Sequence, residues 1–200
     1  MKFRKPLKIT SRTSSITNSF VQAIIPSVEP TAAEVEEALA VLGMTSDTIS
    51  CIYCGAPASD WDHLRPLVRG RRPTGYISEI RNLVPSCGPC NQSKSGADWR
   101  AWMMGTARGS PTSRGVADVG ERIERLQRFV DWGSVQPLAF CGLAGAEEWD
   151  AYWANLEIIE KQMREAQRHA TRIQASIKAA LDKAGKSKVA FGADQALADN

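Results

Sequence analysis

Two short cysteine pairs constrain the fold of this 200-residue chain more than any other feature. Cys51 and Cys54 form the segment CIYC, and Cys87 and Cys90 form the segment CGPC. Each Cys-x-x-Cys turn presents two thiolates, and two such turns complete the tetrahedral ligand set of a structural zinc ion. A redox-active pair needs no second copy, and the surroundings of the pairs do not favour an iron–sulfur cluster. We therefore expect one structural zinc ion per chain, bound by these four cysteines.

The chain around the cysteine pairs has a composition that does not favour a large hydrophobic core. Residues 49–100 are rich in Cys, Pro, Gly and Arg, which is typical of short strands and loops. Zinc binding would contribute the folding free energy that this segment lacks. Because all four ligands are sulfur atoms, the ion would have no open position for chemistry. Cys141 is far away in the sequence, and we expect it to be a small buried apolar residue.

A second pattern lies between the cysteine pairs and just after them. It consists of polar residues at fixed places among apolar ones, namely Asp62 and His63 before Pro66, Asn82 before Leu83, and Asn91 and Lys94 after Cys90. This pattern resembles that of the HNH endonucleases, also called His-Me finger or ββα-metal nucleases, in the subgroup with two Cys-x-x-Cys knuckles. Many members of the family have His at the position of Asn91, and the loop 69–80 has its own sequence.

The resemblance implies a phosphodiester hydrolase with named roles for these residues. His63 would be the general base, for which a near-neutral imidazole is suited. Asp62 and Asn91 would bind a catalytic Mg²⁺ or Mn²⁺ ion, which prefers oxygen ligands. Asn82 would hold the loop that carries the histidine. From the residues alone, His63 could be a core residue, Asp62 a loop cap or a partner of Arg65, Asn91 a helix cap and Asn82 a turn residue.

Basic residues outnumber acidic ones in residues 61–100, which favours contact with a polyanion. We expect DNA contacts from five of them: Arg65, Arg69, Arg71, Arg72 and Lys94. A solvated lysine is nearly as good an interpretation of Lys94, and the sequence does not separate phosphate contacts from base contacts. The expected function is that of an HNH endonuclease, a restriction-like enzyme that cuts both DNA strands at a specific site. The alternatives are a nonspecific or nicking HNH nuclease and a noncatalytic zinc-containing nucleic-acid-binding module.

Outside the cysteine-rich segment the sequence predicts mainly helices. Thr31 and Glu34 have the spacing of a capping box, which starts a helix within residues 30–48. Apolar residues at helical spacing predict a second helix, followed by a loop, within residues 117–146. The predicted fold class is α+β, with a small zinc-stapled ββα-metal finger at residues 49–105 and a linker at residues 106–116.

The C-terminal part carries the longest regular pattern in the chain. From Trp149 to Ala180, apolar or small residues recur at alternating spacings of three and four, which predicts a long heptad helix over residues 147–184. Such a stripe either folds back on other helices or pairs with a second copy, and we favour a homodimer. A dimer would place two fingers on two DNA strands, whereas a monomer would nick one strand. Residues 185–200 are predicted to be a flexible tail.

The N-terminal residues 1–29 are basic and contain no acidic residue before Glu29, so we expect an arm that suits contact with a polyanion. An organelle transit peptide is the alternative interpretation. No apolar run reaches the length of a membrane span, and no signal-peptide core is visible. Paired cysteines fit a reducing compartment, so we expect a soluble cytoplasmic protein without a membrane partner.

Overall fold

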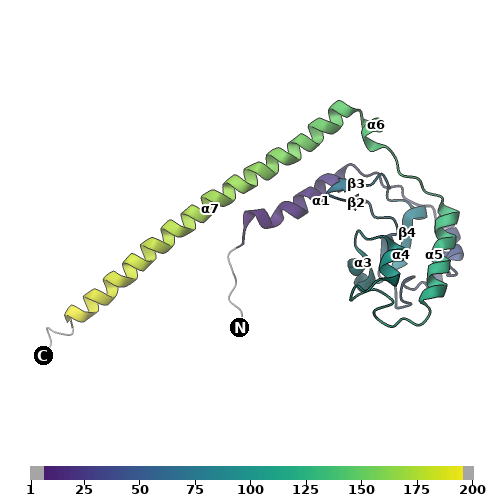
Figure 1. Ribbon diagram of the computed structural model, residues 1–200, viewed down its shortest axis with the longest axis horizontal. Coiled ribbons are helices and arrows are strands. Elements are labelled where there is room, and N and C mark those ends of the chain that lie inside the picture. The colour runs from purple at the N-terminus through teal and green to yellow at the C-terminus, as the bar shows by residue number, and fades with distance from the viewer. Residues whose placement is uncertain (1–6, 196–200) are drawn as a thin grey trace. The chain divides into compact units, whose positions relative to one another are not determined.

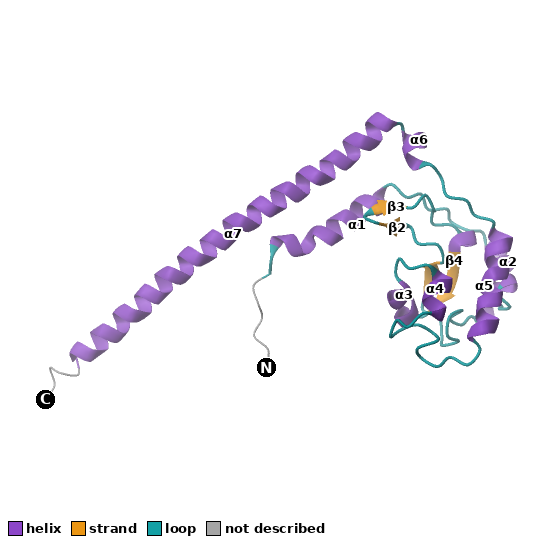
Figure 2. Cartoon of the chain, in the orientation of Figure 1, coloured by secondary structure: helices purple, strands orange, loops and turns teal. Residues whose placement is uncertain are grey.

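The computed structural model describes the backbone of residues 7–195 and the side chains of residues 7–185. The chain divides into two compact units, Asn18–Ala146 and Met1–Thr17 with Glu147–Asn200 (Figure 1). Residues 1–6 of the predicted arm and residues 196–200 of the predicted tail lie outside the description. Helices predominate over two small sheets (Figure 2).

Two strands and a helix form the centre of the first unit. β1 (Asp60–His63) pairs antiparallel with β4 (Leu83–Ser86), so that Asp62 lies opposite Val84. α3 (Gly88–Lys94) begins directly after β4. Between β1 and β4 lies a hairpin of β2 (Val68–Arg69) and β3 (Arg72–Pro73), followed by the 3-10 turn η3 (Ile80–Asn82). The predicted α+β fold with a ββα finger in a mainly helical chain is confirmed.

The finger has a larger hydrophobic core than its own sequence indicated. Helices on both sides of it in the sequence supply the missing apolar residues: α2 (Ala32–Val41), α4 (Trp99–Met104) and α5 (Val119–Gly133). Leu39, Met103 and Leu126 are almost fully buried in the same cluster as Tyr53 and Val84. The expectation that the finger lacks a core was therefore wrong, because the core is completed by segments distant in the sequence.

The helices around the finger begin and end where their sequences indicate. Thr31 Oγ1 accepts a hydrogen bond from the backbone N–H of Glu34 at 3.3 Å, and the Glu34 carboxylate accepts from the N–H of Thr31 at 2.8 Å. This is the predicted capping box at the start of α2. The 3-10 turn η2 (Ser46–Thr48) leads from α2 to the first cysteine pair. α6 (Phe140–Ala144) is short and has no buried residue, so Cys141 is exposed and the prediction of a buried residue was wrong.

The described part of the predicted N-terminal arm is helical. A 3-10 turn, η1 (Ile9–Arg12), leads into α1 (Thr13–Ala23). Thr17 and Val21, one turn apart, are both buried. The polar segment around them shows only a weak apolar period in the sequence, because a threonine takes one of the buried positions. Part of the segment predicted as an arm is therefore a helix with two buried positions.

The second unit contains the long helix α7 (Ala146–Gln195). Trp153 and Leu156 are buried, and Thr17 Oγ1 donates a hydrogen bond to Glu160 Oε1 at 3.1 Å. Further along, Ile159, Ile173 and Ile177 are exposed. The helix continues through residues 185–195, where we expected a flexible tail; no proline interrupts the helix there. Within the described residues, no helix is both long and apolar enough to cross a membrane.

Candidate functional site

The four paired cysteines converge on one point. Their sulfur atoms all lie within 4.8 Å of one another, and Cys54 Sγ is 3.7 Å from Cys87 Sγ. Tetrahedral zinc with bonds of about 2.3 Å separates its sulfur ligands by about 3.8 Å, whereas a disulfide would bring them to about 2.05 Å. The donor set and its spacing therefore fit a structural zinc ion.

The electrostatics of the cysteine cluster point the same way. A hydrogen bond with Cys90 lowers the pKa of Cys51 to about 5. The same hydrogen bond, together with burial, raises the pKa of Cys90, and burial raises that of Cys87. The Cys51 thiol thus ionises more readily than those of Cys87 and Cys90, because the hydrogen bond favours one thiolate and burial disfavours further charge. A bound cation is needed to hold all four sulfur atoms as thiolates.

Two arginines that the sequence pattern did not indicate support this cluster. Arg114 Nη1 donates to Cys90 Sγ at 3.3 Å. Arg122 on α5 donates to the carbonyl oxygens of Cys51 and Ile52 at 3.2 and 3.1 Å, and it forms an ion pair with Asp118 at 2.8 Å. The first turn leaves room for Arg122 only because residue 55 is glycine: a Cβ there would lie 2.7 Å from Arg122 Nη2, and φ is +77°.

Asp62 lies near the end of β1 and is almost completely buried, with 5% exposure. Its carboxylate accepts a hydrogen bond from the hydroxyl of Tyr53 at 2.5 Å. Burial and the Asp62 charge raise the pKa of Tyr53, so its hydroxyl remains a donor. Tyr53 stands between Cys51 and Cys54 in the first turn. The cysteine cluster therefore positions Asp62 through a single intervening side chain.

Lys94 lies inside the molecule, with 1% exposure. Its Nζ is 3.0 Å from Asp62 Oδ2 and donates to the backbone carbonyl of His63 at 2.8 Å. Both earlier interpretations of this residue, a phosphate contact and a solvated lysine, were wrong. The sequence placed Lys94 correctly on α3 with Asn91, but it could not show that the long side chain turns inward to reach β1.

His63 occupies the last position of β1, opposite Leu83. Its Nε2 is 3.0 Å from Ser78 Oγ, a contact that no sequence motif indicated. Burial lowers the pKa of His63, the Lys94 charge lowers it further, and the Asp62 charge opposes both effects. The net direction is downward, so the ring is neutral at physiological pH.

Asn82 is fully buried beside the loop that follows the histidine. Its Oδ1 accepts from the N–H of Arg65 at 2.8 Å, and its Nδ2 donates to the carbonyl oxygens of Arg65 and Ile77 at 3.1 and 3.3 Å. These bonds fix the backbone directly after β1. The side chain itself does not line the neighbouring pocket.

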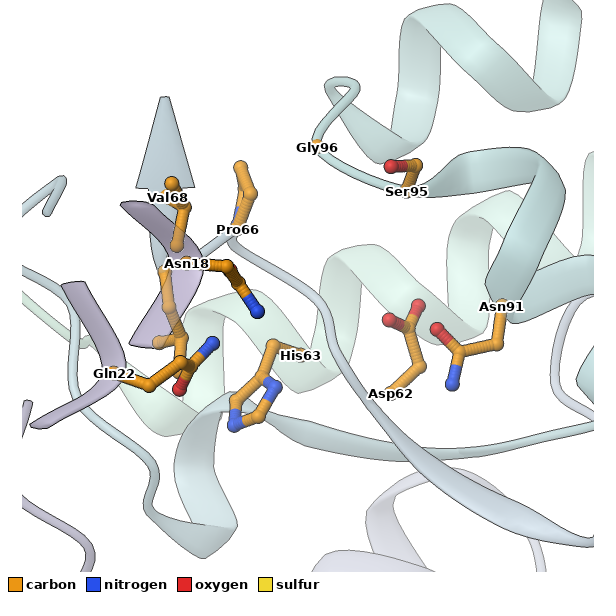
Figure 3. Close-up of a pocket in the computed structure, with 10 residues that line it drawn as sticks. Asn18, Gln22, Asp62, His63, Pro66, Val68, Asn91, Ser95 and Gly96 are labelled. Carbon is orange, nitrogen blue, oxygen red and sulfur yellow. The ribbon is translucent and has the colours of Figure 1, made fainter. Parts of the chain in front are cut away.

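A pocket of about 390 Å³ brings Asp62, His63 and Asn91 together. In the view of Figure 3 the Asn91 side-chain oxygen points towards the Asp62 carboxylate, and His63 lies on the other side of Asp62. Two facing oxygen ligands fit a hard divalent cation such as Mg²⁺. The pocket thus contains two side-chain oxygens that could hold a cation and a neutral imidazole.

The remaining basic residues divide into two groups. Arg69, Arg71 and Arg72 are exposed on the β2–β3 hairpin, whose turn has positive φ at both Gly70 and Arg71. Arg65 is half-buried, and its guanidinium carbon lies 5.6 Å from the centre of the Tyr76 ring. The hairpin arginines are accessible to a nucleic acid, whereas Arg65 is partly engaged by the protein.

Comparisons with known proteins agree with this geometry. Residues 51–96 match the family model described as HNH endonuclease. The chain is also similar to the CRISPR-associated endonuclease Cas9 of Corynebacterium diphtheriae (strain ATCC 700971 / NCTC 13129 / Biotype gravis), with 34% identity over 84 residues. That match covers 40% of this chain and 7% of the Cas9 protein. No solved structure matches the chain. Residues 51–96 thus form an HNH endonuclease domain, and the predicted family resemblance is confirmed.

Proposed function

We propose that this chain uses its HNH endonuclease domain to hydrolyse DNA phosphodiester bonds in a reaction that needs a divalent cation. The observation that carries the proposal is the pocket shared by Asp62, His63 and Asn91. Hydrolysis of a phosphodiester needs a base for the attacking water and a cation for the developing negative charge. A module that only binds nucleic acid would need neither, so the noncatalytic alternative is less well supported.

His63 acts as the general base in this proposal. When Nε2–H donates to Ser78 Oγ, the lone pair of Nδ1 is left to accept the proton of the attacking water. The lowered pKa of His63 keeps this lone pair free at neutral pH. Ser78 is then a positioning residue, because it fixes the ring orientation and the tautomer without contacting the phosphate.

Asp62 and Asn91 would hold the divalent cation, Mg²⁺ or Mn²⁺. When bound there, such an ion supplies positive charge to the phosphate and to the leaving oxygen. Lys94 and Tyr53 hold the Asp62 carboxylate from the protein side at 3.0 and 2.5 Å. Asn82 holds the chain after His63 through buried hydrogen bonds, so both the base and the Asp62 ligand are anchored by the protein.

The cysteine cluster would bind one zinc ion per chain and act as a support. Its sulfur spacing fits zinc, and its four ligands leave no open position for catalysis. Thiols persist in a reducing compartment, which supports a cytoplasmic location for the protein. We assign Arg69, Arg71 and Arg72 to DNA contact because they are exposed beside the pocket on one hairpin. We also assign Arg65, which lies closer to His63 in the sequence, to DNA contact.

A homodimer formed through α7 would make the enzyme a restriction-like cutter of both strands. The exposed side chains Ile159, Ile173 and Ile177 follow the heptad spacing of the helix, and a second copy would cover them. Two copies related by a twofold axis would present two pockets to a palindromic site. A monomer with the same pocket would nick one strand, which is the second candidate function.

The experiment is digestion of supercoiled plasmid by the full chain with Mg²⁺ or Mn²⁺, beside His63→Ala. Discrete linear fragments from the wild type alone would support site-specific cutting of both strands. Nicked circles would support nuclease activity but indicate an enzyme that cuts one strand, not a dimer that cuts both. A smear would indicate a nonspecific nuclease. Equal products from wild type and variant, or no cutting of plasmid or phage DNA, would contradict the proposed activity.

A further inference from the structure

Two side chains from outside the HNH endonuclease domain line the same pocket as the candidate catalytic residues. Asn18 and Gln22 lie four residues apart on α1, which places them one above the other on one face of the helix. In the view of Figure 3, His63 lies between these two amides on one side and Asp62 and Asn91 on the other. The pocket therefore has a second wall that the family pattern does not include.

The amides of Asn18 and Gln22 are available to a ligand. Both residues are exposed, whereas Val21 on the same helix is fully buried. Among the described residues, no protein group is hydrogen-bonded to either side-chain amide. An exposed polar face is the ordinary condition of a surface helix, but these two side chains face a cavity that also contains His63.

The position of α1 beside His63 is fixed by backbone contacts. The chain that follows α1 forms a parallel bridge between Ser27 and Ser78. The N–H of Val28 donates to the carbonyl of Ser78 at 2.8 Å, and the N–H of Ser78 donates to the carbonyl of Pro26 at 3.1 Å. Ser78 in turn contacts His63 Nε2 at 3.0 Å. One short segment thus connects the helix to the general base.

We propose that α1 is a substrate-contact helix in which Asn18 and Gln22 hydrogen-bond the base next to the scissile phosphate. This inference rests on the proposed function. A side-chain amide offers both a donor and an acceptor, which matches the edge of a base better than it matches a phosphate. The amides carry no charge and are suited to reading a base, whereas Arg69, Arg71 and Arg72 supply the charge that attracts the phosphate backbone. A cavity of about 390 Å³ is of the size that accommodates one nucleotide.

The test compares wild type with Asn18→Ala/Gln22→Ala and with the matched control Ser14→Ala. Ser14 is exposed on the same helix and does not line the pocket. Each protein would cut a pool of random-sequence DNA fragments in the presence of Mg²⁺, and sequencing of the cleaved ends would give the base preference around the cut. KM and kcat would be measured separately on one duplex. We expect the double variant to lose most of the base preference at one or two positions beside the cut. We expect its KM to rise about tenfold with kcat within twofold of wild type.

A conservative second variant guards against a folding defect in the first. Gln22→Glu keeps the size of the side chain but leaves only acceptors, so the preferred base should shift towards one that offers a donor, such as cytosine. Circular dichroism melting curves of all variants provide the check on folding. A base preference and KM unchanged in both variants, or a loss confined to kcat, would overturn the role of α1 while leaving the nuclease proposal intact.

DNA binding separates this inference from the proposed function. Fluorescence anisotropy would measure the affinity of a labelled duplex for His63→Ala with and without the Asn18→Ala/Gln22→Ala pair. If the wild type cuts nothing but the pair still weakens binding several-fold, the nuclease proposal fails and the contact helix stands. Unchanged binding, or no binding at any salt concentration tested, would overturn the contact helix.

Discussion

The cysteine cluster and the Asp62–His63–Asn91 pocket are two sites of opposite character within one finger. The cluster has four soft sulfur ligands, three of them buried, and a second layer of support from Arg114 and Arg122. The pocket is open to solvent and is lined by an imidazole and by two side chains, Asp62 and Asn91, whose oxygens we propose as cation ligands. A closed site stabilises, and an open site leaves coordination positions for a substrate. Within one short finger, the cysteine cluster thus has the features of a structural site and the pocket has those of a reactive site.

Tyr53 is the point at which the two sites meet. It lies in the turn between Cys51 and Cys54, and its hydroxyl holds Asp62. A distortion of the cluster should therefore reach the pocket, whereas omission of the divalent cation that we propose for the pocket should leave the cluster intact. The following predictions test this asymmetry in order of decreasing effect.

Loss of zinc should have the largest effect. Cys90→Ser removes one ligand, so we expect loss of bound zinc, loss of cleavage and a melting temperature lower by more than about 20 °C, or about 5 kcal/mol or more for a unit of this size. Metal analysis and melting curves would measure this. Cys141→Ser is the matched control, because Cys141 is exposed and outside the cluster. Stability and activity unchanged after verified loss of zinc would remove the cluster from its supporting role.

Loss of the Lys94 ammonium should be the next largest effect. Lys94→Met leaves Asp62 buried without its ion-pair partner at 3.0 Å, so we expect a loss of about 3–5 kcal/mol in the free energy of unfolding. Chemical denaturation would measure it. Gln92→Met on the exposed side of α3 is the control and should be nearly neutral. If Lys94→Met were as stable as the control, the ion pair would not contribute to folding.

Loss of the Tyr53 hydroxyl should be smaller and more specific. Tyr53→Phe removes one hydrogen bond to the Asp62 carboxylate, which costs about 2 kcal/mol for a bond to a charged group. We expect zinc content to be unchanged while the Mg²⁺ concentration needed for half-maximal cleavage rises several-fold. Tyr76→Phe alters a hydroxyl outside the pocket and serves as the control. An unchanged Mg²⁺ requirement would break the link between the two sites.

The pH dependence of cleavage should show the smallest but most diagnostic effect. The neutral imidazole is the active form, and burial lowers the pKa of His63 below its ordinary 6.5. We therefore expect kcat/KM to be flat near neutrality and to fall only as the pH drops below 6.5. The unfolded chain binds the proton more readily, so the free energy of unfolding should also decrease as the pH falls through 6.5. The measurement is kcat/KM as a function of pH. If kcat/KM already decreased as the pH was lowered from 8 to 7, this assignment would be contradicted.

Local patterns in the sequence predicted the parts of the site that are local in the fold. Cys51 with Cys54, Asp62 with His63, and Cys90 with Asn91 are neighbours, and their spacing carries the family resemblance and the ββα order. The capping box of α2 is equally local. Each of these features depends on residues within one turn or one strand.

Contacts between distant segments could not be predicted in this way. Ser78 reaches His63, and Arg122 reaches Cys51, across tertiary packing that leaves no periodic signal. The burial of Lys94 depends on α3 lying against β1, and the placing of Asn18 depends on the bridge at Ser27. The apolar face of α1 was also obscured, because Thr17 fills a buried position that a pattern search expects to be apolar.

The most direct test of the pocket is the single-turnover rate of DNA cleavage by wild type and by His63→Ala, each with and without added imidazole. The general-base role predicts Mg²⁺-dependent cutting by the wild type and a rate at least about 100-fold lower in the variant. Added imidazole should restore part of the activity of the variant and leave the wild type unchanged. Cleavage by His63→Ala at the wild-type rate, at equal zinc content, would contradict the account.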